Sequence, residues 1–369
     1  MSRQQRPKGF YWGLIIILLL LSATGCWDQR PVETRAAVTS IGVDPGHRPG
    51  LYRFTVVFPN VTTTAGTIST VPPNQEYFHE TVQAPSLLDA FQSIQRRQSR
   101  SLYLGQVRVL ALSTHLPSQD WHTMLEEAAG AGKVVLTFVV VGTNNAHRLV
   151  TLIPPTEAVP ELALYRALTC NCQPVKIPNR AWHVWDQMNT PGVTPIVIHV
   201  SVTRGVFSQD GLDLVTPHHI ISWPFPTVVG WAYLLGRVRK GMVTIPVQRG
   251  TVIVARIHGT AHLSLHQQGS FVTAVDQLTY TGRLVGGHFP VRHLSQVEHQ
   301  LTPTIARRIL ELCDNTWHQA QRTQTDPFGW HRSLLWQNTT EGFRTLTTWK
   351  AWHVTFVVHF HIHSQGVLQ

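Results

Sequence analysis

The hydrophobic pattern begins with a short apolar run close to the N-terminus. Three basic residues and no acidic ones precede the run, which covers residues 10–21, and small residues then lead to Cys26. A positively charged start, a short apolar run and small residues are typical of a secretory signal peptide. The run is shorter than the roughly 18 to 20 residues that a membrane-spanning helix needs. Residues 1–25 are therefore predicted to be a cleaved signal and not a permanent membrane span.

The small residues Ser22 to Gly25, directly before Cys26, are typical of a lipoprotein processing site. At such a site the thiol receives a diacylglyceryl group and the cysteine becomes the first residue of the mature protein. Two or three acyl chains, at about 0.8 kcal/mol per buried methylene, give lasting attachment, whereas one chain is marginal. Ala23 stands where Leu is more usual, and a buried thiol after an ordinary signal is the alternative. The sequence predicts a globular protein tethered to lipid through Cys26.

Patterns of strand and helix alternate after the cysteine. Residues 36–43 and 51–58 are β-rich, and the loop of Pro and Gly between them predicts an antiparallel pair. Ser86 and Asp89 have the spacing of a capping box. Further strands are expected at 78–83, 106–112 and 133–141, and helices at 87–97, 118–129 and 160–168. This order predicts an α/β domain over residues 26–195, which can divide near residue 140 and ends in an irregular segment from 174 to 195.

Residues 196–369 are dominated by β-rich segments. These are residues 196–207, 228–235, 242–247, 251–257 and 271–284, with a turn at 209–211. One long helix is expected, with Thr302 as its cap and Pro303 at its first position. Apolar residues at helical spacing share one face of it, namely Ile305, Ile309, Cys313 and Trp317. Residues 352–363 alternate apolar and polar side chains, as in a half-buried strand. The pattern predicts an α+β domain with a long helix over a mainly antiparallel sheet.

The composition fits a folded, multi-domain protein. Apolar residues make up 43% of the chain and charged residues 14%, which suffices for real cores. The net charge is +10 and becomes +7 when the three basic residues of the signal are removed. The remaining basic residues are scattered and not interleaved with aromatic ones, so nucleic-acid binding is not expected.

The cysteines and histidines do not form a recognisable site. Cys170 and Cys172 are one residue apart and Cys313 is far away, so these three are interpreted as bystander thiols. The residues His359, His361 and His363 share one face of the last expected strand, about 7 Å apart. That spacing is too large for neighbours to hold one metal ion, and a solvated face is the better interpretation.

Short signatures of common enzymes are missing from the sequence. There is no Gly-x-Ser-x-Gly elbow, and residues 130–133 resemble a phosphate loop without its first Gly or its Ser/Thr. A glycine that ends a helix explains those residues better. We predict no catalytic residue, no metal and no cofactor. A hydrolase that uses some of the histidines is the least favoured hypothesis.

Three blocks, taken together in their order, resemble the Ger(x)C-type spore germination lipoproteins, the C subunits of nutrient germinant receptors. The blocks are Gly25-Cys26-Trp27-Asp28, Gly230-Trp231 and Asp326-Pro327-Phe328-Gly329. Asp-Pro-Phe-Gly is expected to form a turn with a buried ring, and Gly-Trp a bend packed by the indole. Candidate interface or structural residues are therefore Trp27, Asp28, Gly230, Trp231, Asp326, Pro327, Phe328 and Gly329.

The resemblance implies mixed α/β domains and a non-catalytic subunit held by lipid on the outer face of the spore inner membrane. It also implies two multi-spanning membrane proteins as partners. The competing hypothesis from the sequence is a substrate-binding lipoprotein of a membrane transporter, which would have a deep cleft between its domains.

Overall fold

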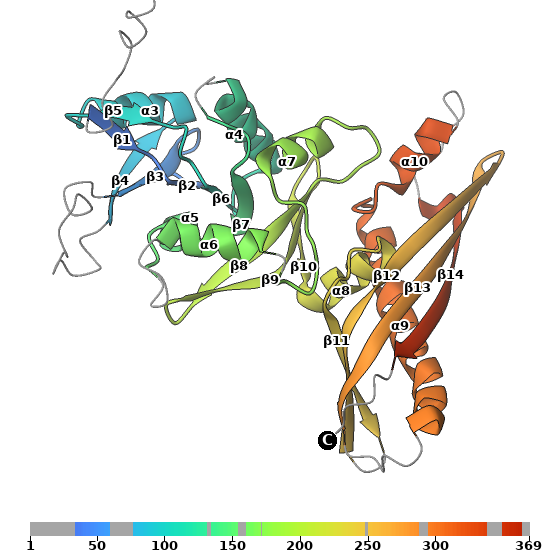
Figure 1. Cartoon of the computed structure of the whole chain (residues 1–369). Coiled ribbons are helices and arrows are strands. Elements are labelled where there is room, and N and C mark those ends of the chain that lie inside the picture. The colour runs from blue at the N-terminus through green and yellow to red at the C-terminus, as the bar shows by residue number, and fades with distance from the viewer. Residues whose placement is uncertain are drawn as a thin grey trace, which may run out of the picture.

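The fold is described from a computed structural model of the chain. It covers residues 34–59, 77–130, 134–153, 160–170, 172–247, 250–287, 294–337 and 349–363. Two units lie next to each other, one built on an eight-stranded sheet and one on a four-stranded sheet (Figure 1). The multi-domain mixture of α/β and α+β structure that the sequence predicts is confirmed.

The eight-stranded sheet has a parallel centre and antiparallel edges. Strands β2, β6, β7 and β8 pair in parallel, and a hairpin-like antiparallel arrangement continues on each side. In spatial order the strands are β10 (Ile220–Pro224), β9 (Val206–Val215), β8 (Ile196–Thr203), β7 (Val139–Thr143), β6 (Val109–Ser113), β2 (Ser40–Pro45), β3 (Tyr52–Pro59) and β4 (Tyr77–Ala84). A separate parallel pair joins β1 (Arg35–Ala37) to β5 (Ser101–Tyr103).

Helices cover both faces of this sheet. They are α3 (Leu87–Gln95), α4 (Ser118–Gly130), α5 (Ala146–Val150), α6 (Pro160–Thr169) and α7 (Ala181–Met188). Val109 and Ala111 of β6 belong to the same core as α5 and α6, whereas Leu110 and Leu112 belong to the core of α3 and α4. All five residues of β6 are therefore buried. The strand expected at 106–112 is present but begins later, at Val109, and it has no solvent face.

Some of the elements predicted for the first unit are confirmed, and others differ from the structure. The antiparallel pairing of β2 with β3 is confirmed, with Ile41 opposite Val56. The helix after Ser86 is also confirmed, because the Ser86 hydroxyl accepts a hydrogen bond from the Asp89 amide at 3.1 Å. Strand β7 begins later than expected, at Val139. The expectation of an irregular segment over 174–195 is wrong, since it holds α7, a helix that begins without a side-chain cap.

The hairpin between β8 and β9 turns earlier than expected. Its two turn residues, Arg204 and Gly205, have φ values of 52° and 78°, as the two-residue hairpin turn requires. Arginine rarely adopts this conformation, so the sequence favoured a later turn at 209–211. Gly211 instead lies within β9, where a Cβ atom would stand 2.0 Å from the Trp223 carbonyl oxygen of β10. This glycine permits close strand approach and does not mark a turn.

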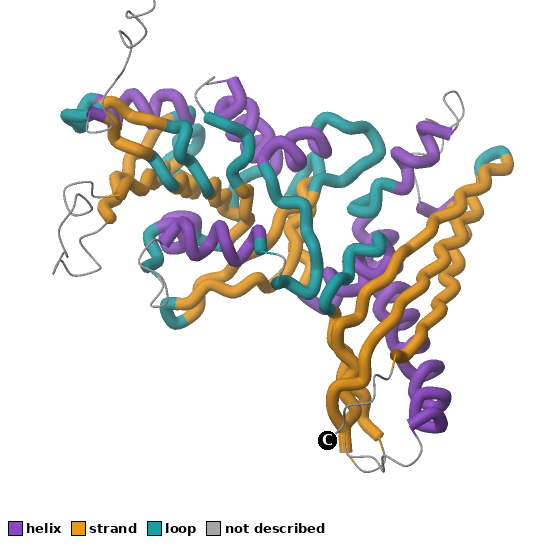
Figure 2. Tube along the Cα trace, viewed as in Figure 1, coloured by secondary structure: helices purple, strands orange, loops and turns teal. Residues whose placement is uncertain are grey.

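The second unit is a long, four-stranded sheet with a helix along one face (Figure 2). Its strands, in spatial order, are β11 (Gly241–Val247), β12 (Gly250–Gln268), β13 (Phe271–Gly287) and β14 (Trp352–His363). Its helices are α8 (Phe225–Leu234), α9 (Leu294–Thr323), α10 (Trp330–Gln337) and a short 3-10 turn (Trp349–Ala351). The first three strands pair antiparallel, and β14 joins β13 in parallel. The predicted long helix over a mainly antiparallel sheet is confirmed.

Two boundaries in the second unit differ from the expectation. The segment 228–235, expected as strand, instead holds most of helix α8 and its C-cap Leu235, and the side chains of the helix are buried around most of its circumference. An all-apolar run has no periodicity that separates a helix from a strand. Helix α9 begins at Leu294 and contains Pro303 in its interior, so Thr302 is not its cap.

The sheet of the first unit continues beyond the division expected at residue 195. Strand β8 pairs in parallel with β7 through Val141 and Ile198, and β9 and β10 extend the sheet to Pro224. Helix α8 follows directly. The divisions at residue 195 and near residue 140 remain predictions.

Candidate functional site

The fold brings together two of the three blocks singled out in the sequence. Gly230 and Trp231 lie on α8, and Asp326 to Gly329 form the turn between α9 and α10. The indole Nε1 of Trp231 donates a hydrogen bond to the Pro327 carbonyl oxygen at 2.9 Å. Since Trp231 is only 1% exposed, this bond is made within the protein core. Residues 96 positions apart thus meet in one structural junction.

Gly230 is the point at which α8 and α9 touch. A Cβ atom at this position would stand 2.1 Å from Thr316 Oγ1 and 2.4 Å from the Leu312 carbonyl oxygen. The Thr316 hydroxyl lies within hydrogen-bond distance of the carbonyl oxygens of Thr227, at 3.1 Å, and Leu312, at 2.8 Å. The expected bend at Gly-Trp is wrong, because Gly230 is inside a regular helix. Its missing side chain serves close helix packing instead.

Asp326 organises the turn that follows α9. One carboxylate oxygen accepts hydrogen bonds from the amides of Phe328 and Gly329, at 3.1 and 2.9 Å. The other accepts from the amide of His331 at 2.8 Å and lies 3.0 Å from its ring Nδ1. Gly329 has φ of 75°, a conformation that favours glycine. The predicted turn with a buried Phe328 ring is confirmed.

A cluster of aromatic side chains surrounds this turn. Trp330 stacks on Phe328 at 4.7 Å and on Trp317 at 5.4 Å between ring centroids. Trp349 meets Trp317 edge-on at 4.7 Å, and its indole donates to the Thr325 carbonyl oxygen at 3.0 Å. These large buried rings fix the turn against α9 and β14.

The same turn is also hydrogen-bonded to the first unit. The Thr194 amide donates to the Asp326 carbonyl oxygen at 2.8 Å, and the Asp326 amide donates to the Thr194 hydroxyl at 2.7 Å. Thr194 lies two residues before β8. No pattern in the sequence singles out Thr194 or Thr316, because threonines occur throughout the chain. We call the set formed by Thr194, Gly230, Trp231, Thr316 and Asp326–Gly329 the junction.

The chemistry of the junction is structural. The Asp326 carboxylate is already surrounded by four nitrogen atoms that can donate to it, and it faces no nucleophile. Across the described ranges, no group of three or more His, Cys, Asp or Glu side chains could hold a metal ion. The junction therefore joins elements through hydrogen bonds and buried aromatic rings.

The cysteines differ in one respect from the expectation. Cys170 and Cys172 form a disulfide, so their interpretation as bystander thiols is wrong. Their Cα atoms lie 5.2 Å apart, within the range that a disulfide requires. Cys313 is a free, buried thiol in α9.

The histidines of the last strand lie where the sequence placed them. His359, His361 and His363 are exposed on one face of β14, while Phe360 on the other face is buried. The alternation of core and solvent sides along this strand is confirmed.

The N-terminal block lies outside the described residues. This applies to the signal at 1–25 and to Cys26, Trp27 and Asp28. Where the structure is described, none of the helices has both the length and the apolar character needed to cross a bilayer.

Comparisons with known proteins point to spore germination. Residues 28–202 match the sequence model of the spore germination protein N-terminal domain. Spore germination protein KC of Bacillus subtilis (strain 168) is 22% identical over 165 residues, which cover 42% of this chain and 40% of that protein. The fold is similar to the crystal structure of the GerBC protein, with a TM-score of 0.57 and 13% identity, over 88% of this chain and 97% of that one.

None of these descriptions names an enzyme, and the second comparison spans well under half of its relative. The structural likeness extends the agreement in fold into the second unit, beyond the matched domain. Together, these matches show that residues 28–202 are similar to the N-terminal domain of spore germination proteins, and that the fold of the chain is similar to that of GerBC.

Proposed function

We propose that this chain is the lipid-anchored, non-catalytic subunit of a nutrient germinant receptor in the spore. In this role it is tethered through Cys26 to the outer face of the spore inner membrane and contacts two multi-spanning membrane subunits. The observation that carries the proposal is the match of residues 28–202 to the germination domain, directly after the lipoprotein-type cysteine.

The spacing between Cys26 and the first strand limits the reach of a lipid anchor. Strand β1 begins at Arg35, nine residues after Cys26, and an extended chain spans at most about 3.6 Å per residue. A lipid on Cys26 would therefore hold the start of the first unit within about 30 Å of the bilayer. That distance allows direct contact with the extracytoplasmic loops of membrane-embedded partners.

The buried link between the two units suits a subunit in which a movement of one unit, caused by one partner, displaces the other unit. The junction joins the two units through the paired hydrogen bonds of Thr194 and Asp326. Its surroundings are buried and aromatic, so displacement of one unit would strain the other. A large indole, Trp336 of α10, remains 76% exposed beyond this cluster and offers contact area to a partner.

The test of the anchor is Cys26→Ala in the intact organism. We expect the variant protein to leave the membrane fraction and the spores to respond poorly to nutrients, because one unacylated chain has no lasting hold on the bilayer. Cys313→Ala is the matched control, since it removes a thiol that is buried in α9. Normal membrane retention and normal germination of the Cys26→Ala strain would contradict the proposal.

A transporter's substrate-binding lipoprotein remains the second candidate. One observation favours it, a cavity of about 920 Å³ lined from both units by residues such as Val175, Tyr233 and Met242. Deletion of the gene separates the two functions. A germination defect with unaltered nutrient uptake supports the receptor subunit, whereas lost uptake with normal germination supports the transporter.

A further inference from the structure

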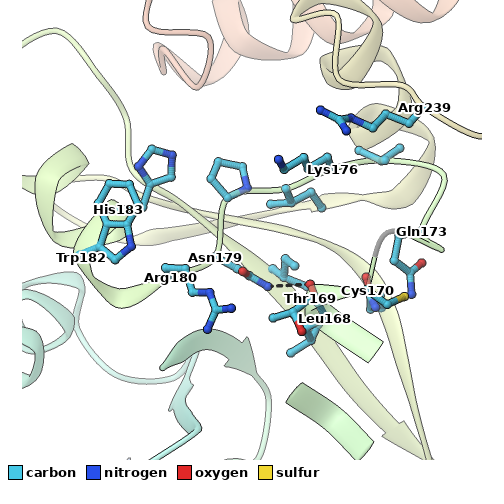
Figure 3. Close-up of a pocket in the computed structure, with 15 residues that line it drawn as sticks. Leu168, Thr169, Cys170, Gln173, Lys176, Asn179, Arg180, Trp182, His183 and Arg239 are labelled. Atoms are coloured by element: carbon cyan, nitrogen blue, oxygen red, sulfur yellow. Dashed lines mark hydrogen bonds between the residues drawn. The ribbon is translucent and has the colours of Figure 1, made fainter. Parts of the chain in front are cut away.

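A second cavity, of about 450 Å³, lies between the end of α6, the start of α7 and the segment after α8 (Figure 3). Its lining carries four basic side chains, namely Lys176, Arg180, His183 and Arg239, and no Asp or Glu. Lys176 and Arg239 are exposed, and neither forms an ion pair with a carboxylate of the described residues. A concave site lined by one sign of charge attracts the opposite charge.

Arg180 is held firmly at the wall of this cavity. Its guanidinium donates to the Tyr165 hydroxyl at 2.6 Å and lies 4.9 Å from the centre of that ring, and it also donates to the Thr137 carbonyl oxygen. These contacts are with neutral groups, so they position the charge without neutralising it.

Two further arginines act on the His183 side chain in the wall of this cavity. The pKa of His183 is lowered by burial and by the neighbouring charges of Arg237 and Arg332, against an opposing effect of Asp186. The ring Nδ1 of His183 is shielded from solvent and has no hydrogen-bond partner within the described structure. A buried nitrogen without a hydrogen-bond partner lowers the stability of the folded protein, and a ligand that forms a hydrogen bond with it would remove this penalty.

Carbonyl oxygens at the wall of the cavity already accept hydrogen bonds from side-chain amides. The last carbonyl oxygens of α6 form the negative end of a helix. The side-chain amide of Gln173 donates to the Ala167 oxygen at 3.0 Å, and that of Gln209 donates to the same oxygen at 3.2 Å. Asn179 donates to the Leu168 oxygen at 3.0 Å, the bond drawn in Figure 3. The basic side chains are therefore left as the dominant polar groups.

The remaining wall is apolar. It consists of Leu168, Val175, Ile177, Pro178, Trp182 and Ile198. Apolar walls with a few convergent charges are typical of small-molecule sites. No acidic side chain among the lining residues could receive an ammonium group, which disfavours simple zwitterions.

We propose that this cavity binds a small organic anion in which a carboxylate or phosphate group is attached to a compact apolar body. Lys176 and Arg239 pair with the oxyanion, and the apolar wall accepts the rest of the molecule. Bidentate arginine contacts suit both carboxylate and phosphate geometry. The proposal does not depend on the anchor or on the receptor role.

The test is isothermal titration calorimetry of the full-length protein with three probes of similar shape: benzoate, phenyl phosphate and the neutral benzamide. We expect one or both anions to bind and benzamide to bind at least about tenfold more weakly, because charged hydrogen bonds contribute about 1.5 to 3 kcal/mol. Tighter binding of benzoate identifies an organic carboxylate as the ligand class, and tighter binding of phenyl phosphate identifies a phosphate ester.

Variants locate the binding in this cavity. Arg239→Gln and Lys176→Gln should each weaken the preferred anion about tenfold. Lys176 lines this cavity alone, whereas Arg239 also lines the larger cavity, so the loss in Lys176→Gln is the one that locates the site. Lys240→Gln is the control, since Lys240 is also exposed and lines only the larger cavity. It should change the affinity less than about twofold, as a surface charge does. Absence of binding at millimolar anion, equal binding of benzamide, or an equal loss in Lys240→Gln would each overturn the proposal.

Discussion

Asp276 is the most unusual residue in the described core. It lies on β13 and is fully buried, and neither carboxylate oxygen has a hydrogen-bond partner within the described structure. Its titratable neighbours are Cys313 of α9 and Tyr280, which are themselves buried. Burial raises the pKa of Asp276 to about 7. A buried carboxyl of this kind stays protonated in the folded protein under mildly acidic conditions.

This residue predicts how stability depends on pH. Below about pH 4 the carboxyl is protonated in both the folded and unfolded states, so it contributes no pH dependence. Between about pH 4 and 7 the unfolded state loses its proton first, so the free energy of unfolding falls by up to about 1.4 kcal/mol per pH unit. Above about pH 7 the carboxyl is ionised in both states, so its destabilising effect on the folded protein no longer changes with pH.

Asp276→Asn removes the charge while keeping the shape. We expect its stability advantage over the natural protein to grow by about 3 kcal/mol between pH 5 and pH 8, measured by urea unfolding. Glu311→Gln, on the surface of α9, should leave the profile unchanged. An advantage of equal size at both pH values would show that Asp276 is not the titrating group.

At the scale of elements, the crossing of α8 and α9 depends on Gly230. Its replacement by alanine puts a methyl group within 2.4 Å of the Leu312 carbonyl oxygen, which belongs to the backbone and cannot rotate away. We expect Gly230→Ala to lower the free energy of unfolding by about 1 to 3 kcal/mol, as overpacking does. Thermal or urea unfolding measures the change.

Gly130→Ala is the control for this substitution. Gly130 ends α4, and a Cβ atom there meets nothing within 4 Å. A methyl group at Gly130 should leave stability unchanged or raise it by about 0.4 to 1 kcal/mol. If both glycine variants unfold alike, the close contact between α8 and α9 is not what Gly230 provides.

Elements could be predicted from the sequence where one face is buried and the other is wet. The buried stripe of α9, from Ile305 to Trp317, and the alternation along β14 are examples. Prediction failed in α8, where burial is nearly complete, because the apolar pattern then loses its period. It also failed at Arg204, where tertiary pairing imposes a turn conformation that arginine seldom adopts.

The junction illustrates the same limit for the candidate site. Gly230, Trp231 and Asp326–Gly329 could be selected as motifs, and the turn at Asp326 followed from its turn chemistry. Their contact could not be predicted, because the bond from Trp231 to Pro327 spans 96 residues. Thr194 and Thr316 carry no pattern at all, since their roles arise only from the elements that pack around them.

At the scale of the whole molecule, two units share one buried junction, and the chain resembles spore germination proteins in sequence over residues 28–202 and in overall fold. The central claim is that this body works at a membrane surface through a lipid on its first mature residue. The family match begins at residue 28, immediately after the cysteine that the sequence assigns as the anchor. An anchored protein of this design should expose both units to neighbouring membrane proteins.

Intact-protein and peptide mass spectrometry of the chain purified from spore membranes tests this claim most directly. We expect a mature N-terminus at Cys26, with the mass of a diacylglyceryl group on that residue and in some molecules an additional acyl chain on its amine. A mature chain that begins at another residue, or an N-terminal Cys26 with an unmodified thiol, would contradict it.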